Sequence, residues 1–183
     1  MTMTAAAEFI PVKVAVLTVS DTRTEATDTS GNLLVESVTG AGHEVTDKQI
    51  SLDDVYQIRA IVSGWIASPE VEAILITGGT GFSGRDTTPE AVAPLFDKQI
   101  EGFGEVFRHI SFNEIGTSTV QSRALGGLAN NTVIFCMPGS TNACRTAWNG
   151  IIQQQLDATH KPCNFVKLIT ERRLSVDACE TRG

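Results

Sequence analysis

The chain has 183 residues, a length that fits one domain with a substantial buried core. Its 42% hydrophobic and 19% charged residues are ordinary for a globular protein. A net charge of −7 argues against duplex nucleic acid or an anionic membrane as the main partner. The four cysteines form no CxxC pair and only three histidines are present, so we expect reduced thiols and no zinc site. No run approaches a membrane span and no secretory signal is evident, so we expect a cytoplasmic protein.

The first third of the chain alternates between strand and helix patterns. Residues 12–19 (VKVAVLTV) form an almost continuous apolar run, typical of a strand buried on both faces, which ends at Ser20 and Asp21. A helix over residues 32–39 follows the capping signal DTSG and stops at two glycines, and residues 43–50 predict a second strand. Asp53 or Asp54 then caps a helix with apolar residues along one face.

The same alternation continues through the rest of the chain. The remaining predicted elements are a strand over 73–77, helices over 88–96 and 100–112, a strand over 132–137, and a long helix to about 159. Thr88 is the expected cap of the first of these helices, with Pro89 in its first turn. Ser140 or Thr141 is the expected cap of the last.

Alternating strands and helices indicate an α/β fold, with a mostly parallel sheet between two layers of helices. We expect this three-layer domain to span residues 11–166, preceded by an N-terminal extension (1–10) and followed by a mobile tail (167–183). Ligands of such sheets bind beyond the carboxyl ends of the strands. Three segments should therefore meet at one edge: residues 20–21, 78–86 and 138–141.

The segment TGGTGFSGRD, residues 77–86, follows a predicted buried strand and predicts a phosphate-binding loop, because glycines let free N–H groups approach an anion closely. It lacks the Gly-Lys-Ser/Thr ending of a P-loop NTPase. Gly79, Gly81 and Gly84 match the dinucleotide pattern, but Arg85 and Asp86 separate the last glycine from the next helix. A nicotinamide enzyme is therefore disfavoured, and a tight turn without a ligand remains the alternative.

Seven segments form an ordered and specific pattern: LTVSDTR (17–23), DTSG (28–31), LITGGTG (75–81), RDTTPEA (85–91), EGFGEVFR (101–108), EIGTSTVQSRA (114–124) and MPGSTNACRTAW (137–148). With them, most of residues 9–165 resembles the MoaB/MogA family of molybdenum cofactor biosynthesis proteins, and the MoaB type in particular. The resemblance implies an α/β fold that binds molybdopterin and a nucleotide. It further implies Mg-ATP-dependent adenylylation of molybdopterin with release of pyrophosphate. A trimeric or hexameric homo-oligomer, with other molybdenum cofactor enzymes as partners, is also implied.

Two carboxylates carry the catalytic expectation. The resemblance places the family's important acidic residues on Asp53 and Asp86, with Asp54 as a possible substitute for Asp53. Mg²⁺ that bridges phosphates is typically held by one or two carboxylates plus waters, so Asp53 and Asp86 are candidate magnesium ligands. The plain alternatives are that Asp53 only caps a helix and that Asp86 only shapes a turn.

The expected molybdopterin and nucleotide contacts come from the strand ends and from the family-matching segments. They are Ser20, Asp21, Thr77, Gly78, Gly79, Thr80, Gly81, Glu105, Ser122, Arg123, Pro138, Gly139 and Ser140. Arg123 can bind phosphate through two hydrogen bonds, and a surface ion pair is the alternative. Ser140 is explained equally well as a helix cap. Two functions remain open: an adenylyltransferase, and a carrier that binds molybdopterin without reacting it.

Overall fold

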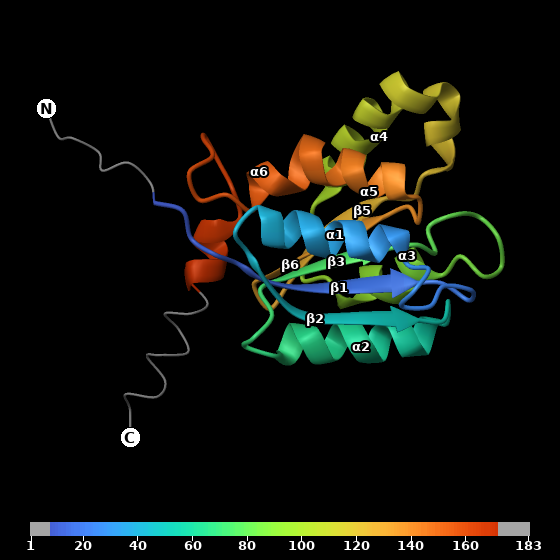
Figure 1. Ribbon diagram of the computed structural model, residues 1–183, viewed down its shortest axis with the longest axis horizontal. Coiled ribbons are helices and arrows are strands. Elements are labelled where there is room, and N and C mark those ends of the chain that lie inside the picture. The colour runs from blue at the N-terminus through green and yellow to red at the C-terminus, as the bar shows by residue number, and fades with distance from the viewer. Residues whose placement is uncertain (1–7, 172–183) are drawn as a thin grey trace, which may run out of the picture.

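The computed structural model describes residues 8–171, which form one six-stranded sheet flanked by helices (Figure 1). The sheet order is β2-β1-β3-β6-β5-β4, with bounds β1 Lys13–Val19, β2 Glu44–Ser51, β3 Ala73–Thr77, β4 Lys98–Gln99, β5 Leu125–Ala129 and β6 Thr132–Met137. Strands β2, β1, β3 and β6 pair in parallel. Strand β5 runs antiparallel to both of its neighbours. The predicted mostly parallel sheet is confirmed, whereas β4 and β5 were not predicted.

Helices cover both faces of the sheet, which confirms the three-layer α/β fold (Figure 1). One face carries α1 Thr29–Gly40, α4 Glu101–Ile115, α5 Thr141–Ala147 and α6 Gln153–Gln155. The other face carries α2 Val55–Ala67 and α3 Thr88–Val92. Within residues 8–171, none of the helices combines the length and the apolar character that crossing a membrane requires.

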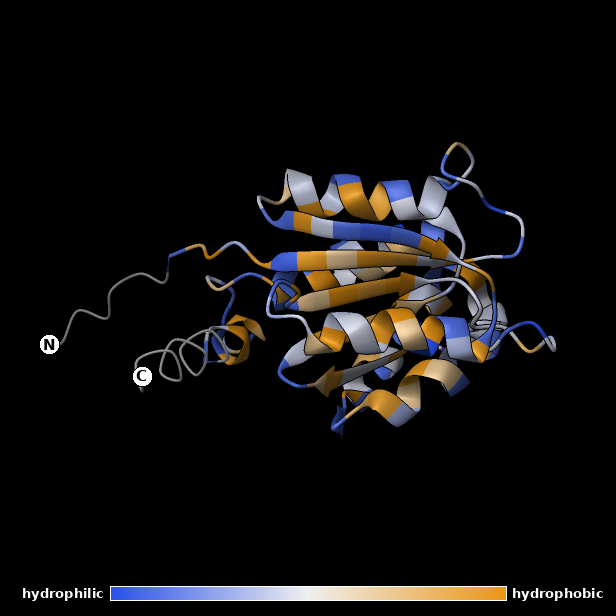
Figure 2. Cartoon of the chain, turned by 90° about the horizontal axis from the view of Figure 1, so that it is seen from below, coloured by the Kyte–Doolittle hydropathy of each residue, from blue (hydrophilic) through white to orange (hydrophobic). Residues whose placement is uncertain are grey.

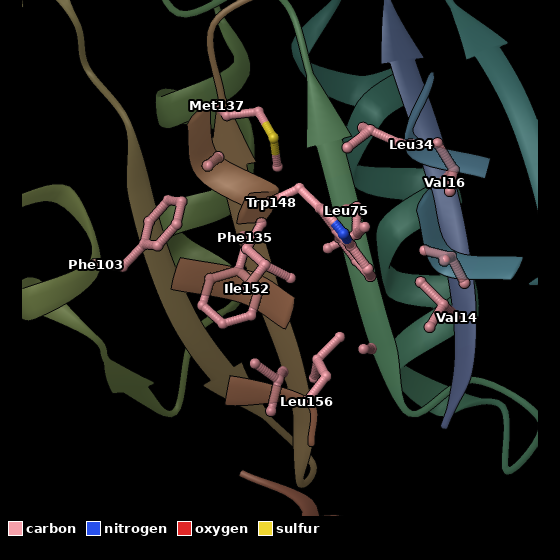
Figure 3. Close-up of a cluster of buried hydrophobic side chains, with 14 of the residues drawn as sticks. Val14, Val16, Leu34, Leu75, Phe103, Phe135, Met137, Trp148, Ile152 and Leu156 are labelled. Atoms are coloured by element: carbon pink, nitrogen blue, oxygen red, sulfur yellow. The ribbon is translucent and has the colours of Figure 1, made fainter. Parts of the chain in front are cut away.

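The core has two halves because successive side chains of a strand point to opposite faces. Val14 and Val16 of β1 pack with the α1, α4 and α5 side, where Figure 3 shows them near Leu34 and Leu75. Ala15 and Leu17 pack instead with the α2 and α3 side. Burial on both sides explains why the central strands are mostly hydrophobic, as the orange colouring of Figure 2 shows.

The helix that follows β6 differs from its predicted length. It begins at the predicted cap Ser140, whose hydroxyl accepts a hydrogen bond from the Ala143 N–H. It then passes through a π-helical turn, Trp148–Ile152, and ends at Gln155 instead of residue 159. The Asp157 carboxylate accepts hydrogen bonds from the N–H and hydroxyl of Thr159. This local turn competes with continuation of the helix.

Part of the predicted C-terminal tail is packed into the core. Val166 and Ile169 are each 1% exposed and join the buried cluster on the α1, α4 and α5 side. Their spacing of three residues places them on one face of a helical turn, which buries Ile169 although it lies in the segment expected to be mobile. The rest of that segment, 172–183, and residues 1–7 of the N-terminal extension lie outside the described residues.

Candidate functional site

A pocket of about 410 Å³ lies where β1, β3 and β6 end. Neighbouring parallel strands bring their carboxyl ends to one edge of the sheet, and all three predicted segments contribute to the pocket. The predicted residues that line it are Ser20, Thr77, Gly78, Gly79, Thr80, Gly81, Asp86, Ser122, Pro138 and Gly139. The expected convergence of strand ends is therefore present in the structure.

The glycines after β3 allow the chain to turn tightly against β1. Gly78 and Gly79 have φ angles of 101° and 64°, which side chains rarely adopt. A Cβ on Gly78 would lie 2.2 Å from the Val19 carbonyl oxygen. A Cβ on Gly79 would lie 2.3 Å from the Thr88 hydroxyl and 2.6 Å from an Asp53 carboxylate oxygen. Both positions therefore require glycine, and the backbone itself forms this wall of the pocket.

Asp86 lines the pocket and also shapes the glycine loop. Its Oδ2 atom accepts hydrogen bonds from the N–H and hydroxyl of Ser83, at 2.8 and 2.5 Å. The Ser83 hydroxyl, followed by the N–H groups of Ser83 and Gly81 and the charge of Arg123, lowers the pKa of the Asp86 carboxyl against an opposing effect of burial. Asp86 therefore shapes the turn and also places a negative charge on the pocket rim, while its role as a magnesium ligand stays a prediction.

Asp53 does not line the pocket. Asp53 is only 6% exposed, and its carboxylate accepts hydrogen bonds from the N–H (2.9 Å) and hydroxyl (2.6 Å) of Thr87. The cap of α2 is Asp54, which accepts from two N–H groups of the first turn, so Asp53 is not the helix cap either. Instead, Asp53 fixes the start of α3, where Thr87 and not Thr88 occupies the cap position. Within residues 8–171, no group of three or more His, Cys, Asp or Glu side chains could hold a metal ion.

Asp21 is also engaged beside the pocket and not in its lining. Arg85 donates to its two oxygens at 2.8 and 2.7 Å, and the Asp53 N–H donates to it at 3.0 Å. The Arg85 hydrogen bonds, followed by the Asp53 N–H, lower the pKa of the Asp21 carboxyl. This contact ties the loop after β1 to the loops after β2 and β3, so Asp21 contributes to the shape of the site.

Three other predicted contacts lie away from the pocket lining. Ser140 caps α5, as the simpler interpretation predicted. Glu105 faces a separate depression beside α4. Arg123 pairs with Glu90 and also donates to backbone carbonyls of the glycine loop. It is therefore not free to bind a phosphate, and it makes more contacts than the simple surface ion pair that was the alternative.

One lining residue has an unsatisfied polar group. The Ser122 hydroxyl is buried and has no hydrogen-bond partner within residues 8–171. Buried hydroxyl groups are nearly always hydrogen-bonded, so Ser122 is an exception among the described residues.

Several lining residues were missed from the sequence: Thr18, Val19, Arg23, Asp28, Ser30, Ile115, Ser118 and Gln121. Asp28 could have been predicted as a lining residue, because the DTSG segment follows the end of β1. Its 1% exposed side chain caps α1 and lies 3.1 Å from the Lys48 ammonium. The lining residues between 115 and 121 come from the end of α4 and from the 3₁₀ helix η2 Gly116–Gln121. No local sequence pattern indicates that this segment lies against the strand ends.

Comparisons with known proteins agree on one family. The family described as "Probable molybdopterin binding domain" matches residues 15–158. Molybdenum cofactor biosynthesis protein B of Escherichia coli strain K12 is 61% identical over 158 residues, which cover 86% of this chain and 93% of that protein. The protein of the same name from Bacillus cereus is 48% identical over 146 residues, covering 79% of this chain and 86% of the relative.

Solved structures give the same result. A crystal structure of molybdenum cofactor biosynthesis protein B superposes with a TM-score of 0.81 at 43% identity, covering 90% of this chain and 97% of the other. The tungsten cofactor synthesizing protein MoaB from Pyrococcus furiosus superposes with a TM-score of 0.70 at 37% identity, covering 77% and 90%.

Proposed function

Since this chain belongs to the family of molybdopterin-binding domains found in molybdenum cofactor biosynthesis proteins, we propose that its strand-end pocket binds molybdopterin and adenylylates it with Mg-ATP. The observation that carries this proposal is the pocket itself. It combines the backbone of residues 78–81, the orphan hydroxyl of Ser122 and the ionised Asp86 on one concave surface. Such a surface suits a ligand with an anionic phosphate and polar ring edges.

The chemistry requires little from side chains. An oxygen of the terminal phosphate of molybdopterin forms a bond to the α-phosphorus of ATP, and the bond from that phosphorus to the leaving pyrophosphate breaks. Both reactants are anions, so the protein must align them and offset their repulsion. The Gly78 and Gly81 N–H groups already donate to the Met137 carbonyl and the Asp86 carboxylate, so the N–H groups of Gly79 and Thr80 hold the molybdopterin phosphate. Arg23 brings a positive charge to the pocket lining.

The carboxylates differ in how well they fit a magnesium ion. Asp86 fits, because its charged carboxylate lines the pocket. Asp53 does not fit as a direct ligand, because its carboxylate is bonded to Thr87 outside the lining. When bound with ATP, magnesium offsets phosphate charge, and Asp86 is the residue that would hold it. Asp53 acts by fixing the start of α3.

A second candidate function is a molybdopterin carrier without transferase activity. The position of Asp53 favours it, since only one of the two expected carboxylates lines the pocket. A carrier needs the amide donors and the Ser122 hydroxyl but does not need a magnesium ligand.

One experiment separates these functions. Wild-type protein is incubated with molybdopterin and Mg-ATP, and adenylylated molybdopterin and pyrophosphate are measured, with a competent adenylyltransferase as positive control. The transferase proposal predicts both products, and it predicts that Asp86→Asn lowers the rate by roughly 100-fold while much of the molybdopterin affinity remains. Asp54→Asn is the matched control, because Asp54 caps α2 outside the pocket and asparagine caps helices equally well. Retained molybdopterin binding without either product would leave the carrier.

We also propose that the chain self-associates through α4 and η2. Val106, Phe112, Ile115 and Val120 are between 46% and 74% exposed on this segment, and Ile115 also lines the pocket. Exposed apolar side chains on one segment support an interaction surface there. Phe112→Ser should lower the mass measured by sedimentation equilibrium, and a wild-type protein that sediments as a monomer would contradict the proposal. Trp65 and Trp148 are buried in the core and are not available for such contacts.

A further inference from the structure

The guanidinium group of Arg123 lies against the backbone of the glycine loop. Its Nε donates to the carbonyl oxygens of Thr80 and Gly81, at 3.3 and 2.8 Å, and its Nη2 donates to the carbonyl oxygen of Asp86 at 2.8 Å. These acceptors belong to the two ends of the loop 80–86. One side chain from the segment before β5 therefore closes a loop that lies about 40 residues earlier in the chain.

These contacts also set the direction of the loop's N–H groups. In a trans peptide unit the C=O and the N–H point in opposite directions. Holding the carbonyls of Thr80 and Gly81 toward Arg123 turns the N–H groups of Gly81 and Phe82 away from it. Gly81 lines the pocket, whereas Arg123 does not. The Gly81 N–H donates to the Asp86 carboxylate. The guanidinium, from outside the pocket, therefore orients a backbone donor that holds Asp86 in place.

Arg123 is itself held in place by two further contacts. Its Nη1 pairs with the Glu90 carboxylate in the first turn of α3, and its guanidinium carbon lies 5.2 Å from the centroid of the Phe82 ring. The side chain is only 23% exposed. A planar guanidinium can serve several acceptors at fixed angles, whereas a lysine ammonium is a point charge without that fork.

We propose that Arg123 is a positioning residue for the pocket: by joining both ends of the loop 80–86 it places the loop backbone and the Asp86 carboxylate where a phosphate-bearing ligand meets them. The proposal rests on the proposed function for the identity of that ligand. The contacts of Arg123 also explain why the segments RDTTPEA and EIGTSTVQSRA lie side by side. Arg123 of the second segment binds the backbone carbonyl of Asp86 and the carboxylate of Glu90, both in the first.

The test compares Arg123→Lys and Arg123→Gln with a matched control, Arg59→Gln. Arg59 also donates to two backbone carbonyls, those of Glu90 and Ala91, but it contacts α3 and not the loop. Binding of molybdopterin is measured by titration calorimetry, and the amide resonances of residues 80–86 are followed by NMR. Both Arg123 variants should bind molybdopterin roughly tenfold or more weakly, because neither side chain can donate to the carbonyls at both ends of the loop at the angles of the guanidinium. Arg59→Gln should bind within about twofold of wild type.

The spectra separate positioning from a general loss of structure. In the Arg123 variants the amide shifts of residues 80–86 should change while those of the central strands stay in place. Arg59→Gln should leave the loop shifts unchanged. If a variant fails to fold, the wild type still decides the matter, because the Arg123 Nε–H should exchange slowly with water when it is bonded to two carbonyls.

Two results would overturn the inference: Arg123→Lys that binds molybdopterin like wild type, or an Arg123 Nε–H that exchanges as fast as free arginine. A wild type that binds no molybdopterin would remove the proposed function instead. In that case the amide resonances of the loop and the exchange of the Arg123 Nε–H still test whether Arg123 positions the loop, because neither measurement needs the ligand.

Discussion

Replacing Gly78 with alanine tests the geometry on which the pocket depends. The φ angle of Gly78 is 101°, and an L residue in this left-handed half of conformational space costs roughly 1–2 kcal/mol. The new Cβ would lie 2.2 Å from the Val19 carbonyl oxygen, which is backbone of the neighbouring strand and cannot swing aside. Overpacking a close-packed site costs about 1–3 kcal/mol. We therefore expect the free energy of unfolding to fall by about 2–5 kcal/mol.

Gly84→Ala is the control in the same loop. Apart from Gly84 and its two chain neighbours, no heavy atom of residues 8–171 lies within 4 Å of a Cβ built at Gly84, so the free energy of unfolding of this variant should change by less than about 1 kcal/mol. Urea titrations followed by circular dichroism and tryptophan fluorescence measure both variants, and unchanged m-values would show that the comparison is two-state. A Gly78→Ala protein as stable as wild type, or a Gly84→Ala protein that loses as much stability as Gly78→Ala, would contradict this expectation.

Three further predictions concern stability and reactivity. Asp54→Ala removes the cap of α2 and should lower the free energy of unfolding by about 1 kcal/mol in the same urea assay. Burial holds the pKa of His43 below its usual value near 6.5. As the pH falls, the unfolded chain therefore takes up a proton at this histidine before the folded chain does, and the free energy of unfolding should fall below about pH 6.5. His43→Gln should reduce this dependence of stability on pH, whereas a replacement of the exposed His109 should not. Burial also raises the pKa of the Cys144 thiol to about 11, so peptide mapping after iodoacetamide treatment of the native protein should find the exposed Cys163 modified and Cys144 intact.

The parts of the fold with a strong local signal were predictable. The apolar runs that form β1, β3 and β6 are rich in β-branched residues and buried on both faces, so their sequence pattern predicts buried strands. Strand β5 was missed because its sequence, LGGLA, contains two glycines that weaken any strand pattern. The structure explains them: a Cβ on Gly127 would lie 2.3 Å from the Phe96 ring.

The pocket was predictable in outline and not in detail. Strand ends and glycines carry local signals, and residues 78–81, which these signals indicated, line the pocket. Asp53 and Arg123 have side chains whose partners lie more than 30 residues away, so their directions depend on tertiary packing. The choice between Asp53 and Asp54 as helix cap is a difference of one residue, which sequence patterns do not resolve.

A crystal structure of the protein grown with molybdopterin tests the claim that the strand-end pocket binds this ligand. We expect its terminal phosphate within hydrogen-bonding distance of the N–H groups of Gly79 and Thr80, with the Ser122 hydroxyl donating to the ligand and Asp86 beside it. Molybdopterin bound away from the ends of β1, β3 and β6, or a pocket that stays free of it at saturating concentration, would contradict the claim.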